Sequence, residues 1–237
     1  MALERHIVVE AALKLLNDVG MDGLTTRRLA QELGVQGPAL YWHFENKQEL
    51  IDAMAQAIMA KAFVPLKPGE DWADWLARRA RRARKAMLSY RDGARLLAGF
   101  RPRGPLGRLT GDHGSDGQAR PGPHGRACER REGAGQESLG EAKAAVAAAL
   151  APLLGPLVAA GFSEPDALFA TLTVGLFTFG WTMDEQAAQG RNPAPSHKFN
   201  PDVGFEFGLE TIIAGLKARK AAGGTAACAP PAEAPAD

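Results

Sequence analysis

The stretch GVQGPALYWHFENK places four rings, those of Tyr41, Trp42, His43 and Phe44, side by side. A short helix can bury only one face, so most of these rings are expected to stay exposed. A tyrosine hydroxyl and an indole N–H can donate hydrogen bonds to phosphate oxygens, and ring edges can contact thymine methyl groups. Lys47 follows closely and adds a charge suited to a phosphate. These residue types at this spacing predict recognition of double-stranded DNA.

An ordinary helical corner, in which the aromatic side chains only close a small core, is the alternative interpretation. The whole chain carries 28 basic and 27 acidic residues, so no global charge attracts nucleic acid. The first 50 residues contain five Lys or Arg and seven Asp or Glu. From these residues alone, both interpretations stay open.

Local signals predict four consecutive helices in the first 62 residues. The first helix is expected over residues 3–19 and ends at Gly20. The second helix begins after Thr25, which can cap its N-terminus, and ends at Gly34.

The third helix, residues 38–44, is short and opens at Pro38, because the first helical turn tolerates proline. Only Leu40 and Phe44 are expected to pack inward. Asn46 and Glu49 have the spacing of a capping box, which predicts a longer helix through about residue 62. Two short helices joined by a tight turn and preceded by a supporting helix predict a helix-turn-helix, whose second helix enters the major groove.

The segments GLTTRRLAQELGV, PALYWHF and NKQELIDAM closely resemble the DNA-binding domain of the tetracycline repressor (TetR) family, and within it the tetracycline-resistance repressors. The resemblance implies a three-helix DNA-binding domain with residues 38–44 as the recognition helix. It also implies that a set of residues contacts or positions the operator: Thr26, Arg27, Gly37, Pro38, Ala39, Tyr41, Trp42, His43 and Lys47. Gly37 replaces a base-reading glutamine of those repressors and Ala39 replaces a threonine, so the operator sequence stays open.

The remainder of the chain predicts further helices, and no strand or hairpin signal is found. The predicted fold class is all-α, with an N-terminal three-helix helix-turn-helix domain and a larger C-terminal helical domain for ligand binding and dimerisation. The expected boundaries are residues 1–47 for the DNA-binding domain and 48–220 for the second domain. A flexible insertion is expected near residues 103–140, which are rich in Gly, Pro, Arg and Asp, and a disordered tail at 221–237. Whether the insertion is a lid or an accident of sequence stays open.

The segments WADWLARRARRARKAML, LFATLTVGLFTFGWTMDEQ and FEFGLETIIAGL resemble the second domain of the same repressors, which binds a magnesium–tetracycline complex and dimerises through a four-helix bundle. Two apolar stripes at helical spacing suit such a bundle. They are Leu168, Leu172, Leu176, Phe179 and Met183, and Phe205, Leu209, Ile212 and Leu216. The alternative is that these stripes form the core of a monomer.

The expected ligand pocket departs from that of these relatives. By position, Leu97 replaces the magnesium-coordinating histidine, Phe63 a second histidine, Arg79 an asparagine, Phe100 a threonine and Leu153 a glutamine, whereas Asp184 stands in place of a glutamate. Magnesium prefers oxygen ligands, and this set is mostly hydrocarbon. An apolar or anionic effector other than tetracycline is therefore expected. The predicted ligand-binding residues are Phe63, Arg79, Ala83, Leu97, Phe100, Leu176 and Asp184.

Arg79 stands out among the basic residues of LARRARRARK. At about 100° per residue, it falls on the apolar side of the predicted helix, near Trp75 and Ala83. The other basic residues fall on the expected solvated face: Arg78, Arg81, Arg82, Arg84 and Lys85. A buried guanidinium needs a partner. Arg79 could pair with Asp184 or with an anionic effector, or it could reach the surface or form a structural pair.

Catalytic motifs are not found: the sequence has no nucleophile elbow, phosphate-binding loop or dinucleotide fingerprint. No enzyme activity, cofactor or metal is therefore expected, and the partial set of His113, His124 and Cys128 in the insertion is too weak to predict a metal site. The apolar run at 167–183 is too short to span a membrane, and the separation of Cys128 from Cys228 fits a reducing cytoplasm.

Two functional hypotheses remain. The first is a homodimeric transcriptional repressor that a small-molecule effector releases from a palindromic operator. The second is a small-molecule carrier whose helix-turn-helix is vestigial. Steeply salt-dependent binding to a palindromic duplex would separate them, because phosphate contacts make affinity fall with salt.

Overall fold

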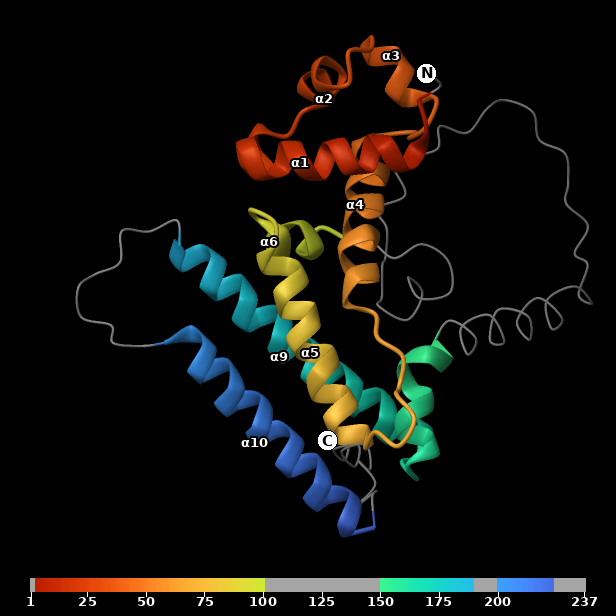
Figure 1. Cartoon of the computed structure of the whole chain (residues 1–237), viewed down its shortest axis with the longest axis vertical. Coiled ribbons are helices and arrows are strands. Elements are labelled where there is room, and N and C mark those ends of the chain that lie inside the picture. The colour runs from red at the N-terminus through yellow and green to blue at the C-terminus, as the bar shows by residue number, and fades with distance from the viewer. Residues whose placement is uncertain (1–2, 101–149, 190–199, 224–237) are drawn as a thin grey trace, which may run out of the picture.

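The computed structural model describes residues 3–100, 150–189 and 200–223 (Figure 1). Every regular element in these ranges is helical, which confirms the all-α fold class. None of these helices is long and apolar enough to cross a membrane. Several predictions concern residues outside the described ranges: the insertion near 103–140, nearly all of the tail, His113, His124, Cys128 and Cys228.

Four helices form the N-terminal part, in the order that the sequence predicts: α1 (Arg5–Gly23), α2 (Thr26–Glu32), α3 (Gly37–Tyr41) and α4 (Lys47–Ala62). Helices α2 and α3 lie at one end of the molecule with α1 beneath them (Figure 1). Helix α4 runs from this end toward the C-terminal helices, so it belongs to both parts of the fold.

The helix boundaries follow from local chemistry. The Thr25 hydroxyl caps α2 by accepting a hydrogen bond from the Arg28 N–H at 3.2 Å, and Gly34 adopts a positive φ of 66° just beyond its end. The Asn46 carboxamide caps α4 by accepting from the Glu49 N–H at 2.9 Å. These predictions are confirmed. Two boundaries differ: α1 bends at Gly20 (φ 69°) but continues to residue 23, and α3 ends before residue 44.

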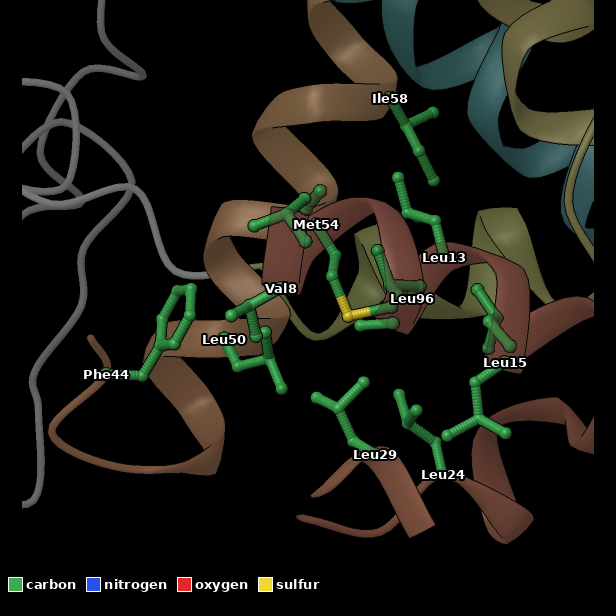
Figure 2. Packing of buried hydrophobic residues seen from close by; sticks show 14 of the residues in the cluster. Val8, Leu13, Leu15, Leu24, Leu29, Phe44, Leu50, Met54, Ile58 and Leu96 are labelled. Carbon is green, nitrogen blue, oxygen red and sulfur yellow. The ribbon is translucent and has the colours of Figure 1, made fainter. Parts of the chain in front are cut away.

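The N-terminal core is built around Met54 of α4, which is fully buried (Figure 2). Its side chain lies among Val8 of α1 and Leu29 of α2, whose burial each contributes roughly 1.5–3 kcal/mol. Leu96 joins this core from a helix more than thirty residues further along the chain. The N-terminal part of the molecule is therefore packed directly against an element of the C-terminal part.

The C-terminal part consists of α5 (Trp72–Leu88), α6 (Gly93–Ala98), α9 (Glu164–Gln189) and α10 (Pro201–Ala221), together with a helical segment at 150–159. Helix α5 packs against both α9 and α10, which run antiparallel to each other (Figure 1). A second core forms where these helices meet, and its largest fully buried side chains are Trp75 and Phe205.

The residues that the sequence assigns to a dimer interface on α10 do not form one, because they pack inside the single chain. Phe205 and Leu209 are fully buried inside the single chain, and Ile212 and Leu216 pack against the same core. On α9, Phe179 is also turned inward. The alternative of a monomer core thus holds for these positions.

The single chain leaves an apolar face exposed on the same two helices, and this face includes Leu172, Leu176 and Met183 of the predicted α9 stripe. Its members are Phe169, Leu172, Leu176 and Met183 on α9, and Val203 and Phe207 on α10. Phe205 and Phe207 differ by about 200° around the helix, so α10 is apolar on two sides. The hydrophobic pattern alone could not say which side faces the core.

The predicted solvated face of α5 is also partly wrong. The Arg84 side chain is only 11% exposed and forms ion pairs with Glu185 of α9 at 2.9 Å and Asp202 of α10 at 2.6 Å. Arg78 is half-buried and pairs with Glu70 at 2.6 Å. Because α9 and α10 flank α5, only a narrow strip of this helix meets water.

Candidate DNA-binding surface and ligand cavity

The aromatic residues of α3 divide as the sequence predicts. Leu40 and Phe44 are buried in the N-terminal core, whereas Tyr41 is 57% and Trp42 is 87% exposed. An indole left almost entirely in water contributes little to folding. The exposed rings are therefore available for a partner.

A shallow groove runs between α2 and α3 and includes five of the predicted DNA-contacting residues: Thr26, Arg27, Gly37, Pro38 and Tyr41. Of the others, Trp42 and Lys47 are exposed, and Ala39 and His43 are half-buried. The structure thus gathers all nine on one end of the molecule, around α3 (Figure 1).

The positive charges near this groove are of two kinds. Within the described ranges, Arg27 and Lys47 form no ion pair, so their charges can act on a ligand. Arg5 is used by the fold: its guanidinium pairs with Glu49 at 2.9 Å and lies 4.3 Å from the centre of the Phe44 ring. Lys14 is also used in this way and pairs with Glu32, and because each pair takes one charge of either sign, the acidic excess of the N-terminal region stays unchanged.

A cavity of about 360 Å³ lies between α4, α5, α6, α9 and the segment at 150–159. Five of the seven predicted ligand-binding residues line it: Phe63, Arg79, Ala83, Leu97 and Phe100. Leu153, placed in the pocket by the resemblance, lines it as well. Residues from both sides of the undescribed stretch 101–149 therefore meet at one cavity.

The other two predicted residues, Leu176 and Asp184, do not reach the cavity of the single chain. Leu176 is 68% exposed and Asp184 is exposed, and neither lines the cavity. Helical geometry explains the position of Leu176, because it lies about 200° around α9 from Val174, which does line the cavity.

The cavity wall is mostly hydrocarbon, and Arg79 is the one charged residue among the described lining residues. Its guanidinium lies 5.8 Å from the centre of the Trp75 ring and forms no ion pair with any described residue. Burial lowers the pKa of Arg79 because no acceptor compensates for the lost water. Of the two orientations that the sequence left open for Arg79, the structure has the inward one, and the pair with Asp184 is not formed within the chain.

Two threonines of α9 also line the cavity, and sequence reasoning missed them. The Thr178 hydroxyl donates to the Val174 carbonyl at 2.7 Å, whereas the Thr171 hydroxyl is buried with no hydrogen-bond partner. Thr171 and Thr178 are seven residues apart, the spacing that puts two side chains on one helix face. That spacing, in an otherwise apolar run, was the available signal.

The lining does not fit a magnesium ion. Magnesium binds through carboxylates, water and ligand oxygens in octahedral geometry. The described lining residues include no carboxylate, carboxamide or imidazole side chain. No group of His, Cys, Asp or Glu suited to a metal occurs elsewhere in the described part of the chain either.

Helix α6 connects the cavity to the DNA-facing end. Leu97 lines the cavity, while Arg95 of the same helix forms an ion pair with Asp22 of α1 at 2.7 Å. The Gln186 carboxamide of α9 accepts from the Ala94 N–H at 2.8 Å, and the Gln48 carboxamide of α4 donates to the Gly99 carbonyl at 2.8 Å. Helix α6 and the residue that follows it therefore contact the cavity, α1, α4 and α9 directly.

The supporting helix α1, the short helix α2 and the short, exposed helix α3 form a helix-turn-helix, and a helical body with a cavity follows it. Comparison with known proteins makes the class specific. Residues 8–54 match the family model described as bacterial regulatory proteins, tetR family. Residues 64–108 match the model for the tetracyclin repressor-like C-terminal domain.

Individual relatives agree with these family models. The class A tetracycline repressor protein of transposon 1721 from Escherichia coli is 37% identical, with 92% of each chain covered. The structure of TetR (class A) in complex with 5a,6-anhydrotetracycline and magnesium is similar, with a TM-score of 0.62, 36% identity and coverage of 91% of this chain and 99% of that one. The structure of BioQ with its double-stranded DNA operator has a TM-score of 0.59 and 30% identity, with 91% and 99% covered. The chain belongs to the tetR family of bacterial regulatory proteins and is a DNA-binding transcriptional regulator.

Proposed function

We propose that the chain is a homodimeric repressor that leaves a palindromic operator when a small molecule other than tetracycline fills the cavity. The observation that carries this proposal is the surface of α3, where the exposed Tyr41 and Trp42 serve no purpose in the core. In this proposal, residues 1–47 bind DNA and residues 48–220 bind the effector and dimerise. The protein acts in the cytoplasm and catalyses no reaction.

DNA recognition uses α3 in the major groove. The unpaired charges of Arg27 and Lys47 lie on either side of this helix in the sequence and suit a base edge and a phosphate, respectively. The BioQ structure with its operator supports this docking. Two copies of α3, one from each subunit, meet half-sites about one helical turn, or a multiple of it, apart.

Dimerisation uses the apolar face of α9 and α10 that the single chain leaves exposed. Leu176 and Phe207 are the most exposed large apolar side chains of these helices. Contiguous exposed apolar surface of this kind marks an interaction site. Two such helix pairs, packed face to face, form a four-helix bundle.

The effector differs from that of the class A relative, whose complex contains 5a,6-anhydrotetracycline and magnesium. The support is the cavity wall, where Leu97 and Phe63 present hydrocarbon and offer no metal ligand. Effector binding favours a dimer whose recognition helices no longer match the operator. Because this coupling is reciprocal, the operator weakens effector binding by the same factor.

Selection of random DNA duplexes by the purified protein at two salt concentrations tests the proposal. Enrichment of a palindrome, with affinity that falls steeply with salt, is the expected result. Weak binding without sequence preference would contradict it and would favour the alternative, a small-molecule carrier whose helix-turn-helix is vestigial.

A further inference from the structure

We propose that the cavity binds an apolar carboxylic acid as its anion, with the carboxylate held between the guanidinium of Arg79 and the hydroxyl of Thr171. The role of this acid as effector rests on the proposed function. The proposal that the acid binds rests on the cavity alone.

The first step is the charge of Arg79. This guanidinium lines the cavity, contacts the Trp75 ring at 5.8 Å and has no carboxylate partner among the described residues. An arginine in a protein stays protonated, and an uncompensated buried charge is strongly destabilising. A ligand anion removes this penalty, whereas a neutral ligand leaves it in place.

The second step is the Thr171 hydroxyl. In the described part of the chain it is the one buried side-chain oxygen or nitrogen without a hydrogen-bond partner. Native proteins satisfy nearly all such groups, so an orphaned hydroxyl at a cavity wall points to a ligand acceptor. Thr171 and Arg79 come from different helices, α9 and α5, and line the same space.

The third step is the rest of the wall, which selects the class of anion. Apolar residues dominate the remaining lining: Leu76, Met87, Leu97, Phe100, Val174 and Phe179. A single guanidinium balances a single negative charge, so a phosphate dianion would bring a second charge into hydrocarbon without a partner. A carboxylate accepts two parallel hydrogen bonds from a guanidinium and has further lone pairs for a hydroxyl. A hydrophobic monocarboxylate matches all three features, and a cavity of about 360 Å³ has the size of a small-molecule site.

One competitor for Arg79 is a carboxylate from a second copy of the chain. Asp184 is exposed on α9, next to the apolar face that we assign to dimerisation. If Asp184 of the partner subunit reached Arg79, the cavity would have no need of an anionic ligand. The experiment therefore includes a variant of this residue.

The test uses the full chain and isothermal titration calorimetry with a panel of apolar monocarboxylates: naphthoates, cinnamates and medium-chain fatty acids. Each acid is compared with its own primary amide, which has nearly the same size and shape but no charge. Wild-type protein is expected to bind at least one acid, and to bind it about tenfold or more tightly than its amide. In Arg79→Met this preference is expected to fall below about twofold.

Thr171→Val is expected to weaken binding of the acid about threefold or more. Arg82→Met serves as the matched control, because Arg82 is an exposed arginine on the same helix that donates to the Lys61 carbonyl and does not line the cavity. This control is expected to keep the wild-type preference. Arg79→Met and Thr171→Val are also expected to leave the ligand-free protein at least as resistant to urea as wild type, since the first removes a half-buried charge that has no carboxylate partner among the described residues and the second removes the orphaned hydroxyl.

The proposal is overturned if no acid of the panel binds, or if the preference for acid persists in Arg79→Met. It is also overturned if the preference appears only in Asp184→Asn, because the partner's carboxylate would then occupy Arg79. Selection of DNA duplexes is measured separately. If the protein binds an acid but selects no operator, the proposed repressor function is contradicted and the carboxylate site stands. If it selects an operator but binds no acid, the carboxylate site is contradicted and the repressor function stands.

Discussion

The Asp92 carboxylate accepts a hydrogen bond of 2.8 Å from the backbone N–H of Met21, which lies 71 residues earlier in the chain. Asp92 precedes α6 and adopts a left-handed φ of 58°, the one positive φ of a residue other than glycine in the described ranges. The contact falls where α1 bends at Gly20, and a Cβ on Gly20 would lie 2.8 Å from the same carboxylate oxygen. The bend in α1 and the start of α6 therefore form one joint between the two parts of the molecule.

Asp92→Ala is expected to lower the free energy of unfolding by about 1–3 kcal/mol, because it leaves a backbone N–H unpaired and removes the short polar side chain that helps a residue other than glycine to adopt a left-handed conformation. Asp92→Asn is the matched variant and is expected to cost less, since asparagine tolerates this conformation and its carboxamide oxygen can accept the same hydrogen bond. Urea unfolding of the three proteins measures both effects. If the alanine variant were as stable as wild type, the hydrogen bond between Asp92 and Met21 would contribute nothing to the free energy of unfolding.

Trp42→Ala and Leu40→Ala separate recognition from folding. Trp42 is almost fully exposed, so its loss is expected to change the free energy of unfolding by less than about 0.5 kcal/mol while weakening operator binding at least about tenfold. Leu40 is buried, and its truncation is expected to cost about 2–5 kcal/mol of stability. Filter binding to the selected operator and urea unfolding give the two quantities. A Trp42 variant with full operator affinity would remove this side chain from the interface.

Lys47→Gln tests a single phosphate contact. Each such contact contributes a slope of about −0.9 to the logarithm of affinity against the logarithm of salt concentration. A dimer loses one contact per subunit, so the slope is expected to become less steep by about 2. Lys67→Gln, an exposed lysine between α4 and α5, is the control and is expected to keep the wild-type slope. The prediction fails if both variants have the same salt dependence.

Phe207→Glu tests the dimer interface. This side chain is exposed in the single chain, so the substitution is expected to leave the protomer folded but to raise the dimer dissociation constant at least about 100-fold. Leu66→Glu makes the same kind of change at another exposed apolar residue, between α4 and α5, and is expected to leave the dimer intact. Sedimentation equilibrium distinguishes the two. A Phe207 variant that stays dimeric would place the interface elsewhere.

Glu70→Gln tests a pH-dependent ion pair. Hydrogen bonds from the Arg78 guanidinium lower the pKa of Glu70 from its ordinary value of 4.5 to about 2. A lowered pKa means that the pair stabilises the fold above pH 4.5 and loses this effect as the pH falls toward about 2. The difference in free energy of unfolding between wild type and Glu70→Gln is therefore expected to be constant near neutrality and to shrink in acid. In an Arg78→Gln background this shrinkage should disappear, and its persistence there would assign it to another group.

Local signals made the DNA-facing part of the fold predictable. Thr25, Gly34, Pro38 and Asn46 act on backbone groups within three residues of themselves, so the sequence contains all the information that they need. Helical period also places Arg79 beside Trp75, but it left open whether the guanidinium turns inward or reaches the surface.

Long-range pairings could not be predicted in this way. Arg84 meets Glu185 across 101 residues, and no spacing rule connects the two positions. Helix α10 is apolar on two sides, so the choice of Phe205 for the core and Phe207 for the surface depends on where α5 and α9 lie. The orphaned Thr171 hydroxyl is defined by the absence of a neighbour, which only a three-dimensional arrangement reveals.

The tryptophans lie in opposite environments at the two ends of the molecule. Trp42 stands in water on α3, whereas Trp75 is 1% exposed and lies against Arg79. An indole in water emits at longer wavelength than one in hydrocarbon, and a dissolved quencher such as iodide reaches only the former. Bound DNA should shield Trp42 from iodide, and a bound acid should alter the short-wavelength emission of the buried indoles. The intrinsic tryptophan fluorescence of the chain thus gives one signal for DNA and another for the acid. The coupling between the two binding sites can be measured in one sample without an added label.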